Sequence, residues 1–407
     1  MKRKFVDFKV LTASLCCAVV MGVISFVFLK MLGLSSVFRE YFPYCIWFLP
    51  LSGMLTAFVY KKYGGESSKG NNLIIQSANE GVKVPKRLAV LTFFFTLLTH
   101  FSGGSAGREG TAVQIGGALT SNVADKFGFK KEDRKTIILS GLSSAFGSVF
   151  GTPLAGAFFG MEVCCIGQLS ASAVIPCFLS SYLANAVTLL LGATHEVHTI
   201  ASIPNFDFKL ILIFVSASVF FGLLGKLFAL AVKYLKLLYA KIFKNTVLSA
   251  LAGSVVVTLL IILLNLNKYE GLSTWQQTTA FEGNANWYDM PVKFILTALT
   301  LGAGFQGGEV TPLFDIGASF GGWYANLFGI EPSFIAAIGL ICVFGSAANT
   351  PITTIMLGIE LFGAEAAPYF VFASLISFIA SGKSGIYSAQ ERKLSKSLFS
   401  AKADFSE

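Results

Sequence analysis

The sequence predicts an all-α, polytopic membrane protein with interrupted helices, and three observations carry that prediction. Apolar residues make up 54% of the 407 residues and charged residues only 13%, whereas an ordinary soluble domain is about 25% charged. Several apolar runs are long enough to cross a bilayer without a charge. The 40 glycines favour close helix packing in lipid and helices that break within the membrane. An ordinary soluble domain is therefore excluded.

The apolar runs define the expected helices in chain order. Two spans, residues 10–29 and 44–60, flank a short polar and aromatic turn at 38–43. Later runs exceed the length of one span and contain Gly-Thr-Pro at 151–153 and Asn-Thr-Pro at 349–351, so we expect broken, tilted and re-entrant helices there. The remaining helical stretches are 71–80, 88–101, 109–124, 137–161, 163–194, 210–244, 246–267, 295–308, 332–359 and 366–382.

The net charge of +9 is read as a topology signal. Basic residues cluster at 2–4 and again at Arg392, Lys393 and Lys396, so the positive-inside rule places both termini in the cytoplasm. We expect the chain to be a multi-pass protein of the cell membrane. The first apolar run lacks a small-residue cleavage site, so a cleaved signal peptide is not expected. A nucleic-acid partner is not expected either, because no soluble domain is present to bind one.

The cysteines and histidines give no sign of a metal centre. The seven cysteines lie mostly in apolar runs without disulfide or ligand spacing, and the three histidines are scattered. We read the cysteines as small packing residues. No metal and no cofactor are expected.

Two patterns recur in the same order about 200 residues apart. Residues 146–162 match residues 344–360 at an offset of 198, and the pattern Gly-x-Glu-x-Thr occurs at 107–111 and at 307–311. Two matches with nearly the same offset indicate an internal repeat. The residues alone leave open whether the two halves are inverted.

The first of these patterns places an adjacent charged pair, Arg108 and Glu109, among glycines in an apolar region. A charge at bilayer depth costs about 2.5–3.5 kcal/mol, so such residues usually face a partner or a water-filled path. A half-helix that begins here would point its N–H groups and positive dipole end at an anion. Glu109 and its counterpart Glu309 then suggest a proton relay coupled to an anion, and the alternative is that each glutamate only caps a helix.

Other polar residues near the expected breaks receive weaker interpretations. Arg108 is expected to be a structural partner of Glu109. Glu162, Glu360 and Asp315 are expected to be structural residues. Uncharged groups that could donate hydrogen bonds along an ion path are Asn71, Asn72, Thr111, Thr311 and Tyr387.

Together, Gly-Arg-Glu-Gly at 107–110, Gly-x-x-x-Pro at 308–312, the repeat and Gly-Lys-Ser-Gly-Ile-Tyr at 382–387 resemble the CLC family of anion channels and proton-coupled antiporters. The resemblance covers nearly the whole chain. It implies one transmembrane domain (residues 1–407) of two inverted repeats, about 10–200 and 208–390, with no cytoplasmic regulatory domain. It also implies a homodimer with one pore per subunit.

The same resemblance implies roles for individual residues. Glu109 would be the gating glutamate that competes with the anion and carries the proton, and Tyr387 would face the central anion site. Asn71 stands where chloride-type members have a serine, Glu309-Val310-Thr311 replaces an aromatic motif, and the inner proton-handling glutamate falls near Val163. These differences resemble the fluoride-exporting branch, in which Glu309 would couple proton and anion. The implied anion contacts are Asn71, Gly107, Gly110, Val310, Thr311 and Tyr387.

The sequence therefore predicts a fluoride/proton antiporter that confers fluoride resistance. A chloride or nitrate/proton antiporter of the CLC type and a passive anion channel are the nearest alternatives. A cation/proton antiporter would not need the glycine turns that attract anions. A membrane enzyme is the least favoured alternative, because no nucleophile–base pair or metal motif is present. A purely structural membrane protein would leave the repeated glutamates unexplained.

Overall fold

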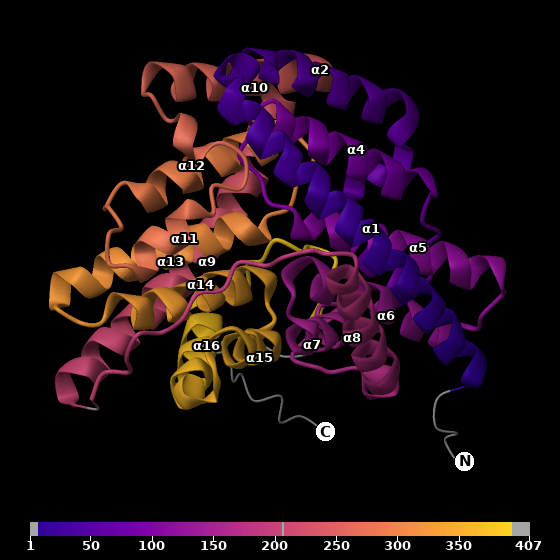
Figure 1. Cartoon of the computed structure of the whole chain (residues 1–407). Coiled ribbons are helices and arrows are strands. Elements are labelled where there is room, and N and C mark those ends of the chain that lie inside the picture. The colour runs from indigo at the N-terminus through magenta and orange to yellow at the C-terminus, as the bar shows by residue number, and fades with distance from the viewer. Residues whose placement is uncertain (1–6, 206, 393–407) are drawn as a thin grey trace, which may run out of the picture.

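The computed structural model describes residues 7–205 and 207–392, which form a helical protein as predicted (Figure 1). Residues 2–4, Lys393 and Lys396, expected near the cytoplasmic ends, lie outside the described residues. Two short strands, β1 (Cys165–Ile166) and β2 (Glu391–Arg392), pair in parallel.

Helices of similar length follow one another in the same order in the two halves of the chain. Those of the first half are α1 (Phe8–Tyr41), α2 (Leu49–Val59), α3 (Asn71–Glu80), α4 (Arg87–Phe101), α5 (Glu109–Lys126), α6 (Lys131–Phe150), α7 (Pro153–Glu162) and α8 (Val174–Leu190). Those of the second half are α9 (Phe208–Ile242), α10 (Thr246–Leu263), α11 (Trp275–Phe281), α12 (Asp289–Gly302), α13 (Val310–Phe328), α14 (Pro332–Ala348), α15 (Pro351–Phe362) and α16 (Ala367–Ser381).

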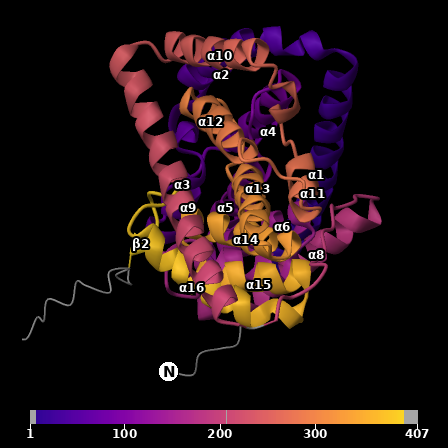
Figure 2. The same cartoon turned by 90° about the vertical axis from the view of Figure 1, so that its left-hand side faces the viewer.

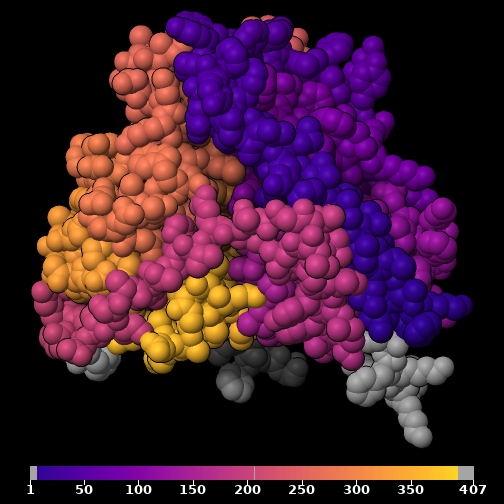
Figure 3. All heavy atoms as spheres, in the orientation of Figure 1, coloured from indigo at the N-terminus to yellow at the C-terminus, as the bar shows by residue number. Residues whose placement is uncertain are grey.

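The two halves lie side by side. Helices α4–α8 occupy the right of Figure 1 and α11–α16 the left, and the space-filling view shows the same division (Figure 3). The long helices α1 and α9 flank the molecule, and α2 and α10 lie together across one end (Figure 2). Within the described residues, six helical stretches are long and apolar enough to cross a membrane.

Helix α1 differs from its prediction. It continues to Tyr41, whereas the sequence suggested a span ending near residue 29 and a turn at 38–43. The polar residues near its end face a pocket and a partner rather than lipid, because Arg39 forms an ion pair with Glu270 at 3.6 Å. A helix can therefore continue past its apolar stretch where its polar side chains find partners.

The predicted breaks are present. Helix α6 is followed by Gly151 (φ 75°) and α7 begins at Pro153, while α14 is followed by Asn349 (φ 59°) and α15 begins at Pro351. Proline suits the first turn of a helix because its missing N–H is not needed there. Each break therefore turns the chain sharply and starts a new helix.

The two helices that follow these breaks cap each other. Glu162, at the end of α7, accepts hydrogen bonds from the backbone nitrogens of Ile352 (2.9 Å) and Thr353 (2.7 Å) at the start of α15. Glu360, near the end of α15, accepts from Leu154 (2.9 Å) and Ala155 (2.8 Å) at the start of α7. These carboxylates satisfy helix N–H groups that would otherwise be orphaned, as expected for structural residues.

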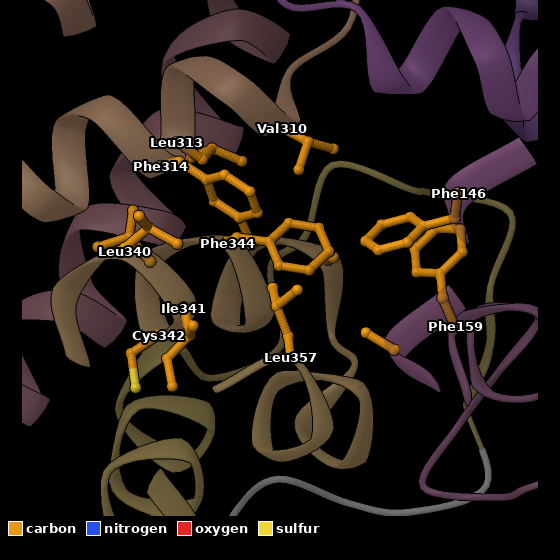
Figure 4. Close-up of a cluster of buried hydrophobic side chains, with 14 of the residues drawn as sticks. Phe146, Phe159, Val310, Leu313, Phe314, Leu340, Ile341, Cys342, Phe344 and Leu357 are labelled. Atoms are coloured by element: carbon orange, nitrogen blue, oxygen red, sulfur yellow. The ribbon is translucent and has the colours of Figure 1, made fainter. Parts of the chain in front are cut away.

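Aromatic side chains join the two halves at their centre. Phe146 and Phe159 stack with ring centroids 4.5 Å apart, and both face Phe344 from the second half (Figure 4). Phe314 packs against the same ring at 5.5 Å. Tight van der Waals packing of this kind drives helix association where lipid removes the hydrophobic effect.

Candidate functional site

Helices α5 and α13 begin next to each other. Their leading segments form an isolated antiparallel bridge, in which Gly107 and Gly308 exchange two N–H···O bonds of 2.7 Å. A side chain does not fit at Gly308, since its Cβ would lie 2.7 Å from the nitrogen of Gly110. The free N–H groups and the positive dipole ends of both helices therefore converge, which favours a negative charge between them.

Glu109 supplies that charge. Its side chain is fully buried, and its Oε2 accepts hydrogen bonds from the backbone nitrogen (3.1 Å) and the hydroxyl (2.5 Å) of Thr311. Its Oε1 lies 3.1 Å from Nε of Arg108, which confirms Arg108 as an ion-pair partner. The first residue of α5 thus caps the start of α13.

Glu309 does not make the mirror-image contact. The hydroxyl of Thr111, the counterpart of Thr311, bonds instead to the hydroxyl of Thr96 at 2.8 Å. The Oε2 atom of Glu309 is buried and has no hydrogen-bond partner among the described residues. It lies next to Gly110, where a Cβ would be 3.0 Å from this oxygen. A buried carboxylate oxygen without a donor is costly while charged, so this site favours a proton or an approaching donor.

Glu309 opens onto a cavity of about 320 Å³, here called the Tyr387 pocket. Asn71 enters it as the first residue of α3, and Tyr387 from the segment after α16. That segment is fixed by Ile386, which donates to the Ala347 carbonyl at 2.9 Å. Charged and polar side chains that line the pocket include Lys69, Asn71, Lys233, Lys236, Glu309 and Tyr387.

The chemistry of the Tyr387 pocket suits a small anion. Three lysines line it against one glutamate. The hydroxyl of Tyr387 is buried and lacks a hydrogen-bond partner in the part of the chain that the structure describes, and the amide nitrogen Nδ2 of Asn71 lies beside Gly110. Hydroxyl and amide groups can donate to an anion, and lysines raise its local concentration.

A second cavity, of about 670 Å³, lies near the end of α1 and is here called the Arg108 pocket. Burial raises the pKa of the Glu270 carboxyl in this pocket to about 7, although the neighbouring Arg39 lowers it. The charged side chains that line the cavity are Arg39, Glu40, Arg108, Glu196, Lys268 and Glu270.

The two pockets lie at opposite ends of α2. Pro43, before this helix, lines the Arg108 pocket, whereas Ser68 and Lys69, after it, line the Tyr387 pocket. Arg108 lines the first pocket and binds Glu109, while Glu309 lines the second. The paired starts of α5 and α13 therefore stand between two polar cavities, with one glutamate associated with each side.

The structure brings the sequence-predicted site residues together in two groups. Asn71 and Tyr387 line the Tyr387 pocket with Glu309. The residues at the paired helix starts are Gly107, Glu109, Gly110, Val310 and Thr311. Asn72 is expected from the sequence to donate along an ion path, but the structure gives it another contact. Its Oδ1 accepts a hydrogen bond from the backbone nitrogen of Ala389 at 3.0 Å.

Sequence reasoning missed the basic lining of both pockets. Lys233 and Lys236 lie one turn apart on α9, and this spacing on an apolar helix was the available signal. Arg39 lies in the last turn of α1, a position that the sequence assigned to a turn. Within the described ranges, no group of three or more His, Cys, Asp or Glu side chains could hold a metal ion.

The chain matches one known protein family over most of its length. The sequence profile of the voltage gated chloride channel family matches residues 52–382. The chloride/fluoride channel protein of Pseudomonas syringae pv. tomato is 38% identical over 380 residues, which cover 92% of this chain and 84% of that protein. The H(+)/Cl(-) exchange transporter ClcA of Vibrio cholerae is 26% identical over 325 residues, which cover 75% and 69%.

Solved structures show the same fold. A crystal structure of a CLC-type fluoride/proton antiporter superposes with a TM-score of 0.89 at 34% identity, covering 94% of this chain and 98% of that one. A slow cyanobacterial Cl−/H+ antiporter superposes with a TM-score of 0.80 at 17% identity, covering 94% and 97%. The second likeness is one of fold alone.

Proposed function

Since the chain belongs to the CLC family of voltage-gated chloride channels, we propose that it exports fluoride across the cell membrane in exchange for protons. The observation that carries this proposal is the buried Glu109 carboxylate, which is held by Thr311 between two polar cavities. A titratable group at that place can bind a proton and can vacate the helix start for an anion. The likeness to a solved fluoride/proton antiporter at 34% identity supports this choice.

Fluoride demands strong donors because it is small and strongly hydrated. The Tyr387 pocket offers the Asn71 amide and the Tyr387 hydroxyl, and the start of α13 offers the Thr311 hydroxyl and backbone N–H. Fixed donors at short range can replace a hydration shell. The relative named as a chloride/fluoride channel protein supports fluoride as the substrate.

Proton and anion compete for the same place in this scheme. When Glu109 is charged, its oxygen occupies the N–H and hydroxyl of Thr311. When Glu109 is protonated, its attraction to the helix start weakens, and fluoride takes these donors. Glu309, with its unpartnered oxygen beside Gly110, couples the two events from the Tyr387 pocket.

The charges support an orientation in the membrane. Lys61, Lys62 and Lys69 follow α2 on the side of the Tyr387 pocket, and Lys241 and Lys244 lie at the end of α9. On the positive-inside rule, we propose that this side and both termini face the cytoplasm. The Tyr387 pocket is then the fluoride entrance and the Arg108 pocket the exit.

The proposal includes the architecture that the family implies. Residues 10–200 and 208–390 form two inverted repeats of a single domain, which is supported by the antiparallel Gly107–Gly308 bridge and the reciprocal Glu162 and Glu360 caps. The assembled protein is a homodimer with one pore per subunit. A cross-linking and light-scattering measurement of the purified protein tests the dimer.

The function is tested with purified protein in liposomes loaded with fluoride or chloride at equal concentration. Fluoride should leave far faster than chloride, and protons should enter as it leaves. Equal chloride efflux would contradict fluoride selectivity. Fluoride efflux without proton movement would favour the second candidate, a passive anion channel. The 38% identical relative, which is named a chloride/fluoride channel protein, supports that candidate.

A further inference from the structure

Asp315 is a buried acid with no role in the transport cycle proposed above. It lies on α13 four residues after Thr311, so the two share one face of the helix. Its side chain is fully buried, and Lys293 from α12 is fully buried beside it. Two buried charges next to the site of Glu109 require an explanation.

The hydrogen bonds around Asp315 leave one of its oxygens open. Oδ1 accepts from Nε2 of Gln277 at 2.7 Å. Oδ2 lies 3.7 Å from Nζ of Lys293 and accepts no hydrogen bond within the described ranges. The lysine instead donates to the carbonyls of Gly271 (2.9 Å) and Leu272 (3.0 Å). A purely structural ion pair would be expected to satisfy both oxygens, because an open one is costly.

The same contacts connect Asp315 to the Arg108 pocket. Leu272, whose carbonyl binds Lys293, and the next residue, Ser273, both line that pocket. On its other side Asp315 lies one helical turn from Thr311, which holds the Glu109 carboxylate. Asp315 therefore lies one turn of α13 from the residue that holds Glu109, and its partner Lys293 contacts the lining of the Arg108 pocket.

The charged groups around Asp315 set its electrostatic environment. Lys293 of α12 attracts a negative charge on it, whereas Glu109 of α5 and Glu196 of the α8–α9 connection repel one. Arg39 of α1 in turn repels the positive charge of Lys293. Opposed influences of this kind allow both protonation states to be occupied during a cycle.

We propose that Asp315 carries protons between the Arg108 pocket and Glu109. A proton leaves a hydronium ion in the pocket and forms an O–H bond at the open Oδ2, and that bond then breaks as the proton passes to the Glu109 carboxylate. Lys293 keeps its protons throughout and balances the charge of the ionised aspartate. This inference rests on the proposed proton antiport and names its path on one side of the membrane.

The test compares fluoride turnover with fluoride binding in the same preparations. Asp315→Asn should bind fluoride with a Kd within about twofold of wild type and should turn over about tenfold more slowly or worse. Its turnover should rise with acidity on the Arg108-pocket side more steeply than that of wild type, and Asp315→Glu should recover most of the rate. The relay would be overturned if Asp315→Asn turned over fluoride at the wild-type rate. It would also be overturned if its turnover fell only in proportion to a loss of fluoride-binding protein.

Two further variants guard against a folding defect. The double variant Lys293→Met/Asp315→Asn leaves no unpaired ammonium, and it should remain slow; recovery of the wild-type rate would overturn the proposal. The matched control Asp289→Asn removes another buried acid, one bound to Tyr269 and Asn286, and should keep the wild-type turnover per fluoride bound.

The same liposomes separate this inference from the proposed function. A wild-type protein that moves fluoride without protons would overturn antiport and relay together. A coupled wild type with an unimpaired Asp315→Asn variant would overturn the relay alone.

Discussion

Thr311 donates two hydrogen bonds to Glu109, one from its backbone nitrogen at 3.1 Å and one from its hydroxyl at 2.5 Å. The contact joins the start of α13 to the first residue of α5, two hundred residues earlier in the chain. It makes the position of Glu109 dependent on donors that an anion can also use. In the proposed cycle, release of this contact is the step in which proton binding and anion binding exchange.

The hydroxyl of Thr311 should contribute to fluoride affinity. Thr311→Val keeps the backbone donor and loses the hydroxyl, so we expect fluoride binding to weaken by about 5–13-fold, the value of one hydrogen bond of about 1–1.5 kcal/mol. Thr311→Ser should restore it. Calorimetric titration with fluoride measures the effect. Thr111→Val, whose hydroxyl contacts Thr96 instead, is the matched control, and equal Kd values in both valine variants would contradict the assignment.

Glu309 should act in coupling and not only in packing. Its open oxygen beside Gly110 has no hydrogen bond to lose within the described residues, so Glu309→Gln should fold normally. We expect its proton-coupled fluoride turnover to fall about tenfold or more, because an amide cannot exchange the proton. Flux from liposomes measures this, with the exposed Glu365→Gln as control. Wild-type turnover in Glu309→Gln would show that this glutamate is only structural.

The reciprocal caps should affect stability and leave coupling unchanged. Glu162→Gln weakens the charge-assisted bonds to the start of α15, and Glu360→Gln does the same at α7. Each should reduce the free energy of unfolding by about 1–3 kcal/mol, visible as a lower melting temperature in detergent. The ratio of protons to fluoride should stay at the wild-type value. A changed ratio at an unchanged melting temperature would assign these residues to transport.

Glu270 should make stability depend on pH. Burial raises the pKa of its carboxyl from 4.5 to about 7, against the pull of Arg39. Between these two pH values the folded state keeps the Glu270 proton and the unfolded state loses it. The contribution of Glu270 to the free energy of unfolding is therefore full below pH 4.5 and is lost as the pH rises through about 7. The loss is at most about 3 kcal/mol. Melting temperatures across this range should fall more in wild type than in Glu270→Gln, and parallel curves would refute the assignment.

Much of the fold was predictable because membrane helices follow from local apolar patterns. The breaks at Pro153 and Pro351 and the residues at which α5 and α13 begin followed from residues close in sequence, whereas the pairing of the two helix starts did not. The end of α1 did not, because Arg39 remains helical through an ion pair with Glu270, more than two hundred residues away. A local pattern carries no information about such a partner.

The candidate site was predictable in its members and not in its arrangement. The repeat predicted that Glu109 and Glu309 hold equivalent places, yet only Glu109 caps the opposite helix. That difference depends on the orientation of each glutamate side chain. It also depends on Thr96, whose hydroxyl forms a hydrogen bond with the hydroxyl of Thr111. The sequence predicts a structural role for Asp315, and the open oxygen on which its proposed relay role rests is visible only in three dimensions.

The central claim is that fluoride and proton movements are coupled, and a thermodynamic measurement tests it most directly. In liposomes loaded with fluoride and held at zero membrane potential, outward fluoride flow should drive protons inward against an opposing pH gradient. Glu109→Gln, which cannot carry the proton, should fail to acidify the lumen. Fluoride efflux from wild-type liposomes with no uphill proton movement would contradict the account.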